Sequence, residues 1–392
     1  MIKNNESIPD IKYLYKMIVT DQHWGGRSKV FIWDSDNQRF LGLAEAVFEL
    51  LRRAGYGDGD KLPPFHLLDK NDDQTQGQHF DAYKQPHQEE LPYYIVEQEL
   101  RKKHGKLIRA QTLEERKKLS EQILWFTLHQ HRIHGVDATG HQMEMVLKEH
   151  LEPNLDIFSG LLRRAYEKKL TVIGEQEILG RLNSSRDIGV ITDGTGNHFI
   201  KSVDGHLTEG PIFTNYTRQL LLAREFWRDK REFVERQVRA PISGREGIGY
   251  GIIKISGGYP WGLEFRNTPA SKGTDWGDPL RMWVRNDLQR GNPSRILEGR
   301  VTIKTCGDKH FFSYIRTGHA YYIMGPASTE TDSYGELGFP PNNSGVVFVG
   351  FPVEGPKAGP ILIRPILFRQ IKDYMEDSSK TFDWEAFLPN PL

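Results

Sequence analysis

Apolar and polar positions along the first 88 residues predict two helices and one strand. The pattern indicates a short helix near the start, a strand over Val30–Trp33 and a helix from about Leu41 to Ala54. Glycines follow the second helix, as they commonly do at a C-terminal helix end. Residues 57–88 are polar and contain Pro63-Pro64, so this stretch predicts a loop.

The stretch between residues 89 and 240 predicts mostly helix. Thr112 and Glu115 have the spacing of a capping box, in which each side chain satisfies an exposed backbone amide of the other. Apolar residues at helical period predict a long helix over 215–238. Two short apolar runs predict strands between these helices: Leu170–Ile173 and Ile188–Ile191.

From Gly244 onward the pattern changes to short apolar runs separated by turns rich in glycine, proline and asparagine. The runs predict strands over Tyr250–Ile255, Gly262–Phe265, Ile296–Lys304, Phe311–Ile315, Ala320–Ile323, Val346–Phe351 and Ile361–Phe368, with one helix from about Pro279 to Leu288. The expected fold is therefore α+β (mixed). An α-rich α/β region over 1–240 precedes a β-rich domain over 241–392.

Composition narrows the class of protein. The 52 basic and 52 acidic side chains cancel, which counts against a nucleic-acid coat or a membrane-surface protein, since these are usually basic. The one cysteine, Cys306, excludes an internal disulfide and a zinc site made of cysteines alone. The N-terminus has no apolar signal segment, and no apolar run approaches the length of a membrane span. We therefore expect a cytoplasmic protein without a membrane partner.

The sharpest local signal is an apolar run that ends in Asp34-Ser35-Asp36 ahead of a predicted helix. Two carboxylates spaced by two residues lie on one face of a strand end. Carboxylate oxygens are the ligands that Mg²⁺ prefers, and Mg²⁺ commonly serves phosphate chemistry. We interpret Asp34 and Asp36 as metal ligands and catalytic residues. The alternative is a solvated turn in which these side chains cap the following helix.

This run resembles the first motif of haloacid-dehalogenase-like phosphatases, in which the first aspartate is a nucleophile and the second an acid or base. The chain departs from that motif at Asn37-Gln38, where the family has a small residue and threonine. The later Thr192-Asp193 resembles the family's second motif, an apolar strand that ends in threonine. These short similarities assign no family, and they leave Asp193 as a third candidate catalytic residue.

A glycine-rich loop follows the predicted strand Ile188–Ile191. Such loops turn backbone amides toward a phosphate, so Thr192, Gly194, Thr195 and Gly196 are the candidate phosphate-binding residues. The loop lacks the lysine of a P-loop, and a plain turn is the alternative. If this strand and the strand that ends at Asp34 share a parallel sheet, both ends face one crevice.

A basic run in the helical region offers a substrate-steering surface. Lys102, Lys103 and Lys106 are suited to phosphate contacts, although a solvated helix face is the commoner role of such a run. The histidines between His129 and His150 lack the spacing of a zinc-protease helix and receive no role.

Together these signals favour a metal-dependent hydrolase: a Mg²⁺-dependent phosphoryl-transfer or phosphodiester-cleaving enzyme of the nuclease or phosphatase type. Its substrate would be a nucleotide or a nucleic acid. Two alternatives stay open. One is a non-catalytic protein that binds a partner through the β-rich domain, and the other is an effector secreted without a signal sequence.

Overall fold

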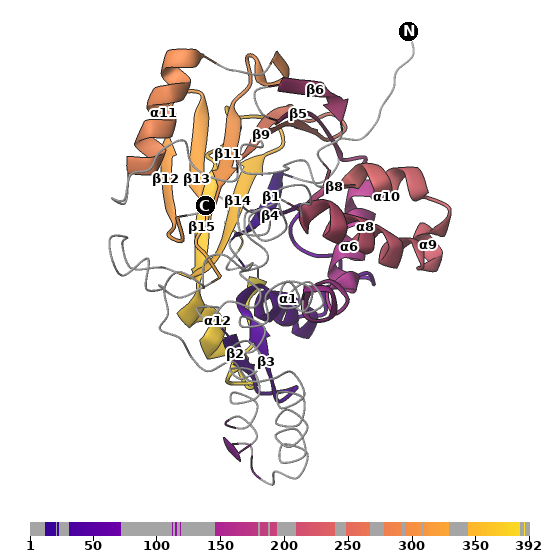
Figure 1. The fold of residues 1–392 in the computed structure, drawn as a ribbon. Coiled ribbons are helices and arrows are strands. Elements are labelled where there is room, and N and C mark those ends of the chain that lie inside the picture. Colours follow the sequence, from indigo (N-terminus) through magenta and orange to yellow (C-terminus); the bar gives the residue numbers. More distant parts are fainter. Residues whose placement is uncertain are drawn as a thin grey trace, which may run out of the picture.

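The structure is a computed structural model. It describes residues 12–20, 22, 31–71, 112, 114–115, 118, 146–178, 181–186, 189–193, 209–239, 248–266, 278–291, 295–307, 309–328, 344–384 and 388. Helices and strands combine in mixed sheets, which confirms the α+β fold class (Figure 1). None of the helices in these ranges is long and apolar enough to cross a membrane.

The described strands are β1 Tyr13–Thr20, β2 Phe31–Asp34, β3 Arg39–Gly42, β4 Leu67–Asn71, β5 Thr171–Ile178, β6 Arg181–Arg186, β7 Ile191–Asp193, β8 Val238–Arg239, β9 Ile248–Lys254, β10 Trp261–Arg266, β11 Thr302–Cys306, β12 Ser313–Arg316, β13 Ala320–Met324, β14 Gly345–Pro352 and β15 Leu362–Leu367. The described helices are α1 Leu43–Arg53, α6 Leu155–Glu167, α8 Glu209–Leu222, α9 Glu225–Arg228, α10 Arg231–Gln237, α11 Asp278–Arg290 and α12 Phe368–Met375, with the π-helix η1 Val146–Leu151 and the 3-10 turn η2 Arg295–Leu297.

Two large sheets form the body of the fold. The first has the strand order β15-β14-β1-β4-β7-β8, and β1, β4, β7 and β8 run parallel to one another. The second has the order β12-β13-β11-β10-β9-β5-β6, in which β10, β11 and β13 are parallel. The sheets contact each other through buried side chains. The ammonium group of Lys16 in β1, for example, lies 4.1 Å from the ring centre of Phe265 in β10.

The predicted boundary near residue 241 does not coincide with a break between the sheets. The first sheet joins β1, β4, β7 and β8 to β14 and β15, and the second joins β5 and β6 to the strands from β9 to β13. One hydrophobic cluster includes Met17 and Phe48 as well as Leu263 and Phe351. Residues after 241 do carry the run of strands that the sequence predicts, but these strands complete sheets that begin earlier in the chain.

The largest differences from the sequence-based expectation concern β1 and β4. β1 lies where the pattern predicts a short helix, and β4 lies within the stretch predicted to be a loop. Both are central strands with a neighbour on each side, so neither shows the alternation of a half-exposed strand. Lys16, Asp69 and Lys70 also interrupt their apolar runs, although all three side chains are buried.

Two predicted helices have other bounds in the structure. The helix expected from Leu41 begins at Leu43, because Arg39–Gly42 instead pairs with β2 as a hairpin. The helix expected over 215–238 is divided into α8, α9 and α10. The backbone of Arg224 is extended at the first break, where its side chain pairs with Asp156 of α6.

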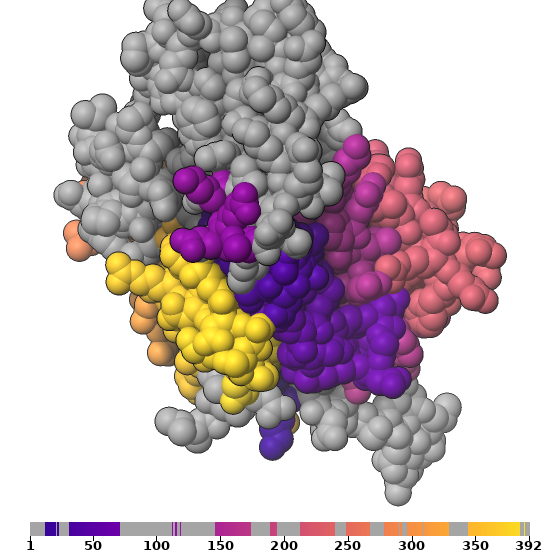
Figure 2. Space-filling model, turned by 90° about the horizontal axis from the view of Figure 1, so that it is seen from below, coloured from indigo at the N-terminus to yellow at the C-terminus, as the bar shows by residue number. Residues whose placement is uncertain are grey.

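Helices α1 and α12 pack against each other below the sheets (Figure 1). Figure 2 shows the C-terminal segment, in yellow, against the N-terminal segment that contains α1. Arg53 of α1 donates a hydrogen bond to the carbonyl oxygen of Tyr374 in α12, and Ser35 donates its backbone N–H to Met375. The β2–β3 hairpin is thereby attached to both helices.

Candidate functional site

Three adjacent parallel strands of the first sheet end at one edge. In the register of the sheet, Thr20 at the end of β1 lies opposite Asn71 at the end of β4, and Lys70 lies opposite Asp193 at the end of β7. Ligands of open sheets with parallel strands bind outside the carboxyl ends of those strands. This edge is therefore the first place to look for chemistry.

The second sheet reaches the same edge. Gly325, directly after β13, donates its N–H to the carbonyl oxygen of Cys306 at the end of β11, with N···O 2.9 Å. A Cβ atom on Gly325 would lie only 2.6 Å from Cγ2 of Thr20, so the close approach of the two sheets requires glycine here. The Thr20 hydroxyl donates to the carbonyl oxygen of Pro326 at 2.8 Å. We call the meeting point of the ends of β1, β4, β7 and β11 with Gly325 the strand-end junction.

A buried ion pair joins β1 and β4 of the first sheet behind the strand-end junction. The Lys16 ammonium lies 2.8 Å from Oδ2 of Asp69, and both side chains are almost fully buried. The hydroxyls of Thr192 and Thr305 donate to the two carboxylate oxygens of Asp69, each at 2.9 Å. Burial lowers the pKa of Lys16, while the Asp69 carboxylate opposes that shift. The hydrogen bonds satisfy both carboxylate oxygens, as a buried charge requires.

A second buried pair lies beside the first. Lys70 Nζ is 2.5 Å from Oδ1 of Asp193, and neither side chain is exposed to solvent. The Thr214 hydroxyl of α8 donates to the other oxygen of Asp193 at 3.0 Å. Asp193 is thus fixed by one cation and one hydroxyl at the end of β7.

The structure places one predicted phosphate-binding residue, Thr192, and one predicted catalytic residue, Asp193, at this edge. Thr192 and Asp193 end β7, and their side chains are bound to Asp69 and Lys70. The remaining loop residues, Gly194, Thr195 and Gly196, lie outside the described residues, as do the predicted steering residues Lys102, Lys103 and Lys106.

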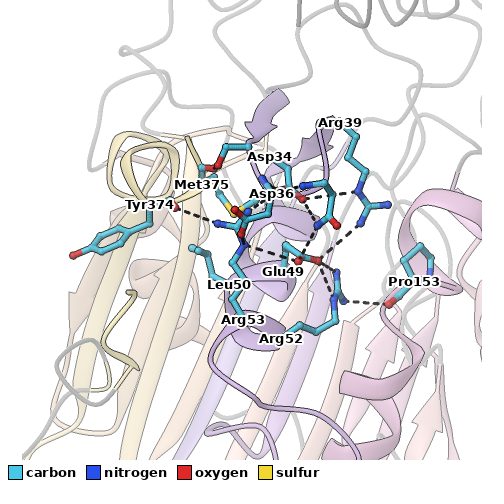
Figure 3. Close-up of polar contacts among 12 residues, drawn as sticks. Asp34, Asp36, Arg39, Glu49, Leu50, Arg52, Arg53, Pro153, Tyr374 and Met375 are labelled. Atoms are coloured by element: carbon cyan, nitrogen blue, oxygen red, sulfur yellow. Dashed lines mark hydrogen bonds and ion pairs between the residues drawn. The ribbon is translucent and has the colours of Figure 1, made fainter. Parts of the chain in front are cut away.

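Asp34 lies in the β2–β3 hairpin, which forms a separate two-stranded sheet (Figure 3). One carboxylate oxygen, Oδ1, accepts the backbone N–H groups of Asp36 and Asn37, each at 3.1 Å. Arg53 of α1 donates to the same oxygen at 2.5 Å, and the Asn37 side chain donates to Oδ2 at 2.8 Å. The carboxylate is therefore surrounded by donors that join the hairpin to α1.

Asp36 lies in the hairpin turn and is partly exposed. Its carboxylate is 2.9 Å from Nε of Arg53, which thus pairs with both predicted metal ligands. Figure 3 shows Glu49 and Arg52 extending this cluster toward Pro153. Among the described residues, Asp34 and Asp36 contact the hairpin and α1, and the structure does not bring them together with Thr192 and Asp193. Their role as metal ligands stays a prediction.

Sequence reasoning missed the residues that form the buried pairs. Lys16, Asp69 and Lys70 stand in runs that otherwise resemble buried strands, Tyr13–Thr20 and Phe65–Lys70. The available signal is a run of β-forming apolar residues with one or two charges in it and opposite charges in neighbouring runs. Charges of this kind are buried when each has a partner.

Comparisons with known proteins add little. No protein-family model and no curated protein matches the chain. Among solved structures, Vps29 from Entamoeba histolytica complexed with Zn²⁺ is similar over 37% of this chain and 76% of the Vps29 chain, with 11% sequence identity and a TM-score of 0.18. That degree of likeness establishes neither the fold nor the function of this chain.

Proposed function

We propose that the chain is a metal-dependent hydrolase of phosphoester bonds with its active site at the strand-end junction. The observation that carries this proposal is the convergence of four strand ends from two sheets at one edge. An edge formed by several strand ends can hold side chains from distant parts of the sequence around one ligand.

The sequence supplies metal-binding side chains directly after these strand ends. Carboxylate, imidazole and amide groups follow in this order: Asp21 and His23 after β1, Asp72 and Asp73 after β4, Asn197 and His198 after β7, and Asp308 and His310 after β11. Such groups are ligands of Mg²⁺, Mn²⁺ and Zn²⁺. All of these except His310 lie outside the described residues, so their part in the proposal rests on sequence position.

The donor chemistry fits a divalent cation, whereas the inner carboxylates are already paired. Asp69 and Asp193 are neutralised by Lys16 and Lys70, so a metal would depend mainly on the groups beyond the strand ends. Within the described ranges, no three His, Cys, Asp or Glu side chains lie close enough together to hold an ion. A bound divalent ion supplies a Lewis acid for a phosphoryl oxygen and a more acidic water.

The chain's own residues would align the substrate. The backbone of Gly194, Thr195 and Gly196, which follows β7 in sequence, would donate N–H groups to a phosphate at this edge. Lys102, Lys103 and Lys106 would attract a polyanion such as a nucleotide or nucleic acid. The lysine–aspartate pairs would keep the strand ends in fixed register, because each pair links two neighbouring strands of the first sheet.

Activity assays with matched variants test this proposal. The purified chain is incubated with Mg²⁺ or Mn²⁺ and with p-nitrophenyl phosphate, its bis ester, nucleotides, and DNA and RNA. Asp21→Asn and His23→Ala should each lower kcat by about 100-fold or more, because metal-held charge acts mainly where charge develops in the transition state. Asp373→Asn and His319→Ala make the same chemical changes at exposed positions and should leave kcat unchanged.

Two results would overturn the assignment. One is an absence of turnover with every substrate and metal. The other is full activity of Asp21→Asn and His23→Ala. If Asp34→Asn with Asp36→Asn abolishes turnover and metal binding while Asp21→Asn does not, the site belongs at the β2–β3 hairpin, as the sequence pattern predicts.

A further inference from the structure

A groove lies between α11 and β12, on the second sheet. It has a volume of about 350 Å³ and is lined by residues of both elements: Arg281, Val284, Arg285, Leu288, Gln289 and Ile315. Leu288 is 72% exposed, and Tyr314 of β12 is 54% exposed. Figure 1 shows α11 along the flank of the sheet beside β12 and β13.

The opposite face of α11 packs against the second sheet, and these buried contacts hold the helix in place beside the groove. Leu280 and Trp283 are fully buried in a cluster with residues of β11 and β13. Asp287 of α11 pairs with Lys304 at 2.6 Å and accepts a hydrogen bond from the Tyr322 hydroxyl at 2.9 Å. The helix therefore presents its outer residues in a fixed orientation.

β12 is the last strand of its sheet in the part of the chain that the structure describes. It pairs on one side with β13, from Ser313 opposite Met324 to Arg316 opposite Tyr321. An edge strand offers backbone N–H and C=O groups to an added extended segment. Since Ile315 lines the groove, alternate side chains of an added strand would lie over it.

We infer that this groove binds an extended segment of a partner protein in which acidic residues alternate with apolar ones. Charge favours that occupant, because Arg281 and Arg285 line the groove together with Val284 and Leu288. Arg281 has a long ion pair of 3.5 Å with Asp278, and Arg285 has no ion pair among the described residues. Both guanidinium groups can therefore pair with incoming carboxylates.

The same charges disfavour a second copy of this chain. A symmetric pairing of two β12 edges would bring two sets of Arg281 and Arg285 to one interface, where like charges repel. A nucleic acid would use the arginines but neither the apolar lining nor the backbone edge of β12, which is the last strand of this sheet among the described residues. The inference goes beyond the proposed hydrolase, since it concerns a different part of the fold.

Fluorescence anisotropy tests the groove directly, in EDTA so that no metal site contributes. The probe is a labelled peptide of alternating Glu and Val, and the reference is the same peptide with Lys in place of Glu. The Glu peptide should bind at least about tenfold more tightly than the Lys peptide. Leu288→Ser and the double variant Arg281→Glu/Arg285→Glu should each weaken binding of the Glu peptide about tenfold.

A matched control changes the same charge elsewhere. Arg228→Glu/Arg231→Glu on α9 and α10 should leave peptide binding unchanged, because these exposed residues lie outside the groove. The inference fails if the Glu peptide does not bind at about 1 mM, or if the control weakens binding as much as the groove variants. It also fails if a single-stranded oligonucleotide binds the groove more tightly than the peptide, or if Leu288→Ser abolishes a dimer seen by sedimentation.

Discussion

The β2–β3 hairpin and the centre of the first sheet both hold aspartates, but in opposite ways. At the hairpin, Asp34 is surrounded by backbone amides and by arginines that reach solvent, with the Arg39 side chain 43% exposed. In the sheet, Asp69 and Asp193 each have one lysine partner and one or two threonine hydroxyls, and all of these groups are buried. Asp34 is itself buried, but its arginine partners can turn to solvent, whereas the sheet charges depend entirely on each other.

This difference decides which of the two regions can be recognised from sequence. The hairpin has the pattern of an active-site strand end, because an apolar run stops at two aspartates. The sheet pairs interrupt their strands with charge and so resemble loops. The sheet pairs nevertheless lie directly behind the edge where strand ends converge.

The largest effect should come from breaking one buried pair. Lys70→Met leaves the Asp193 carboxylate buried with only the Thr214 hydroxyl, so the free energy of unfolding should fall by about 3–5 kcal/mol. Urea denaturation measures this loss. The double variant Lys70→Met/Asp193→Leu removes both charges and should recover most of the stability. A loss below about 1 kcal/mol for Lys70→Met would show that water reaches the pair.

Asp34→Asn should have a smaller effect on the same measurement. The amide oxygen can still accept the backbone N–H groups of Asp36 and Asn37, and the released Arg53 can turn to solvent. We expect a loss of about 1–3 kcal/mol. The expected order is wrong if Asp34→Asn destabilises the chain more than Lys70→Met. The hairpin would then depend more strongly on its charged contacts than the sheet does.

Much of the fold follows from the sequence, but the central strands do not. The β-rich half is predicted well, with β9, β10, β13 and β14 close to their expected bounds, because alternating apolar runs and glycine turns mark each strand. Strands β1 and β4 are missed because each contains buried charged residues. Their ion-pair partners lie on neighbouring strands, which come together only when the sheet forms. Lys16 in β1 pairs with Asp69, which lies 53 positions later in the chain.

The same reason limits what the sequence says of the site. Thr192 and Asp193 lie at a strand end, but the predicted strand Ile188–Ile191 is displaced: β7 is Ile191–Asp193 and includes both residues. The side chains that bind them are Asp69 for Thr192, and Lys70 and Thr214 for Asp193, and the sequence pattern singles out none of these three. Asp34 is placed in a strand as predicted, but that strand pairs with Arg39–Gly42 instead of joining the sheet of β7. Pairing of strands is a long-range choice that a local pattern does not encode.

His66, directly before β4, is a buried titratable side chain that forms no ion pair with a carboxylate among the described residues. Burial, together with the nearby charges of Arg164 and Lys168, lowers the pKa of His66 to about 3. The unfolded chain binds a proton near pH 6.5, so stability is full above that pH and falls as the pH drops toward about 3. Between pH 6.5 and 5.5 this group alone should remove about 1 kcal/mol.

His66→Asn isolates that contribution in urea denaturation at the two pH values. The asparagine oxygen can accept the Tyr15 N–H that the His66 ring accepts at 3.1 Å. The variant should lose less stability on acidification than the wild type, and exposed His319→Asn should behave like the wild type. Equal losses in the wild type and His66→Asn would mean that His66 is accessible to protons in the folded state.

The smallest effect is expected for Asp36→Asn, and it decides between the two regions. The Asp36 side chain is 41% exposed and pairs with an Arg53 that also binds Asp34, so the change should destabilise the chain by less than about 1 kcal/mol. Millimolar Mg²⁺ should raise the Tm of the wild type and of Asp36→Asn equally if metal binds at the strand-end junction, since a ligand of the folded state stabilises it. If the Mg²⁺-induced rise in Tm disappears in Asp36→Asn and persists in Asp21→Asn, the hairpin carboxylates bind the metal. The metal site would then belong to the hairpin and not to the strand-end junction.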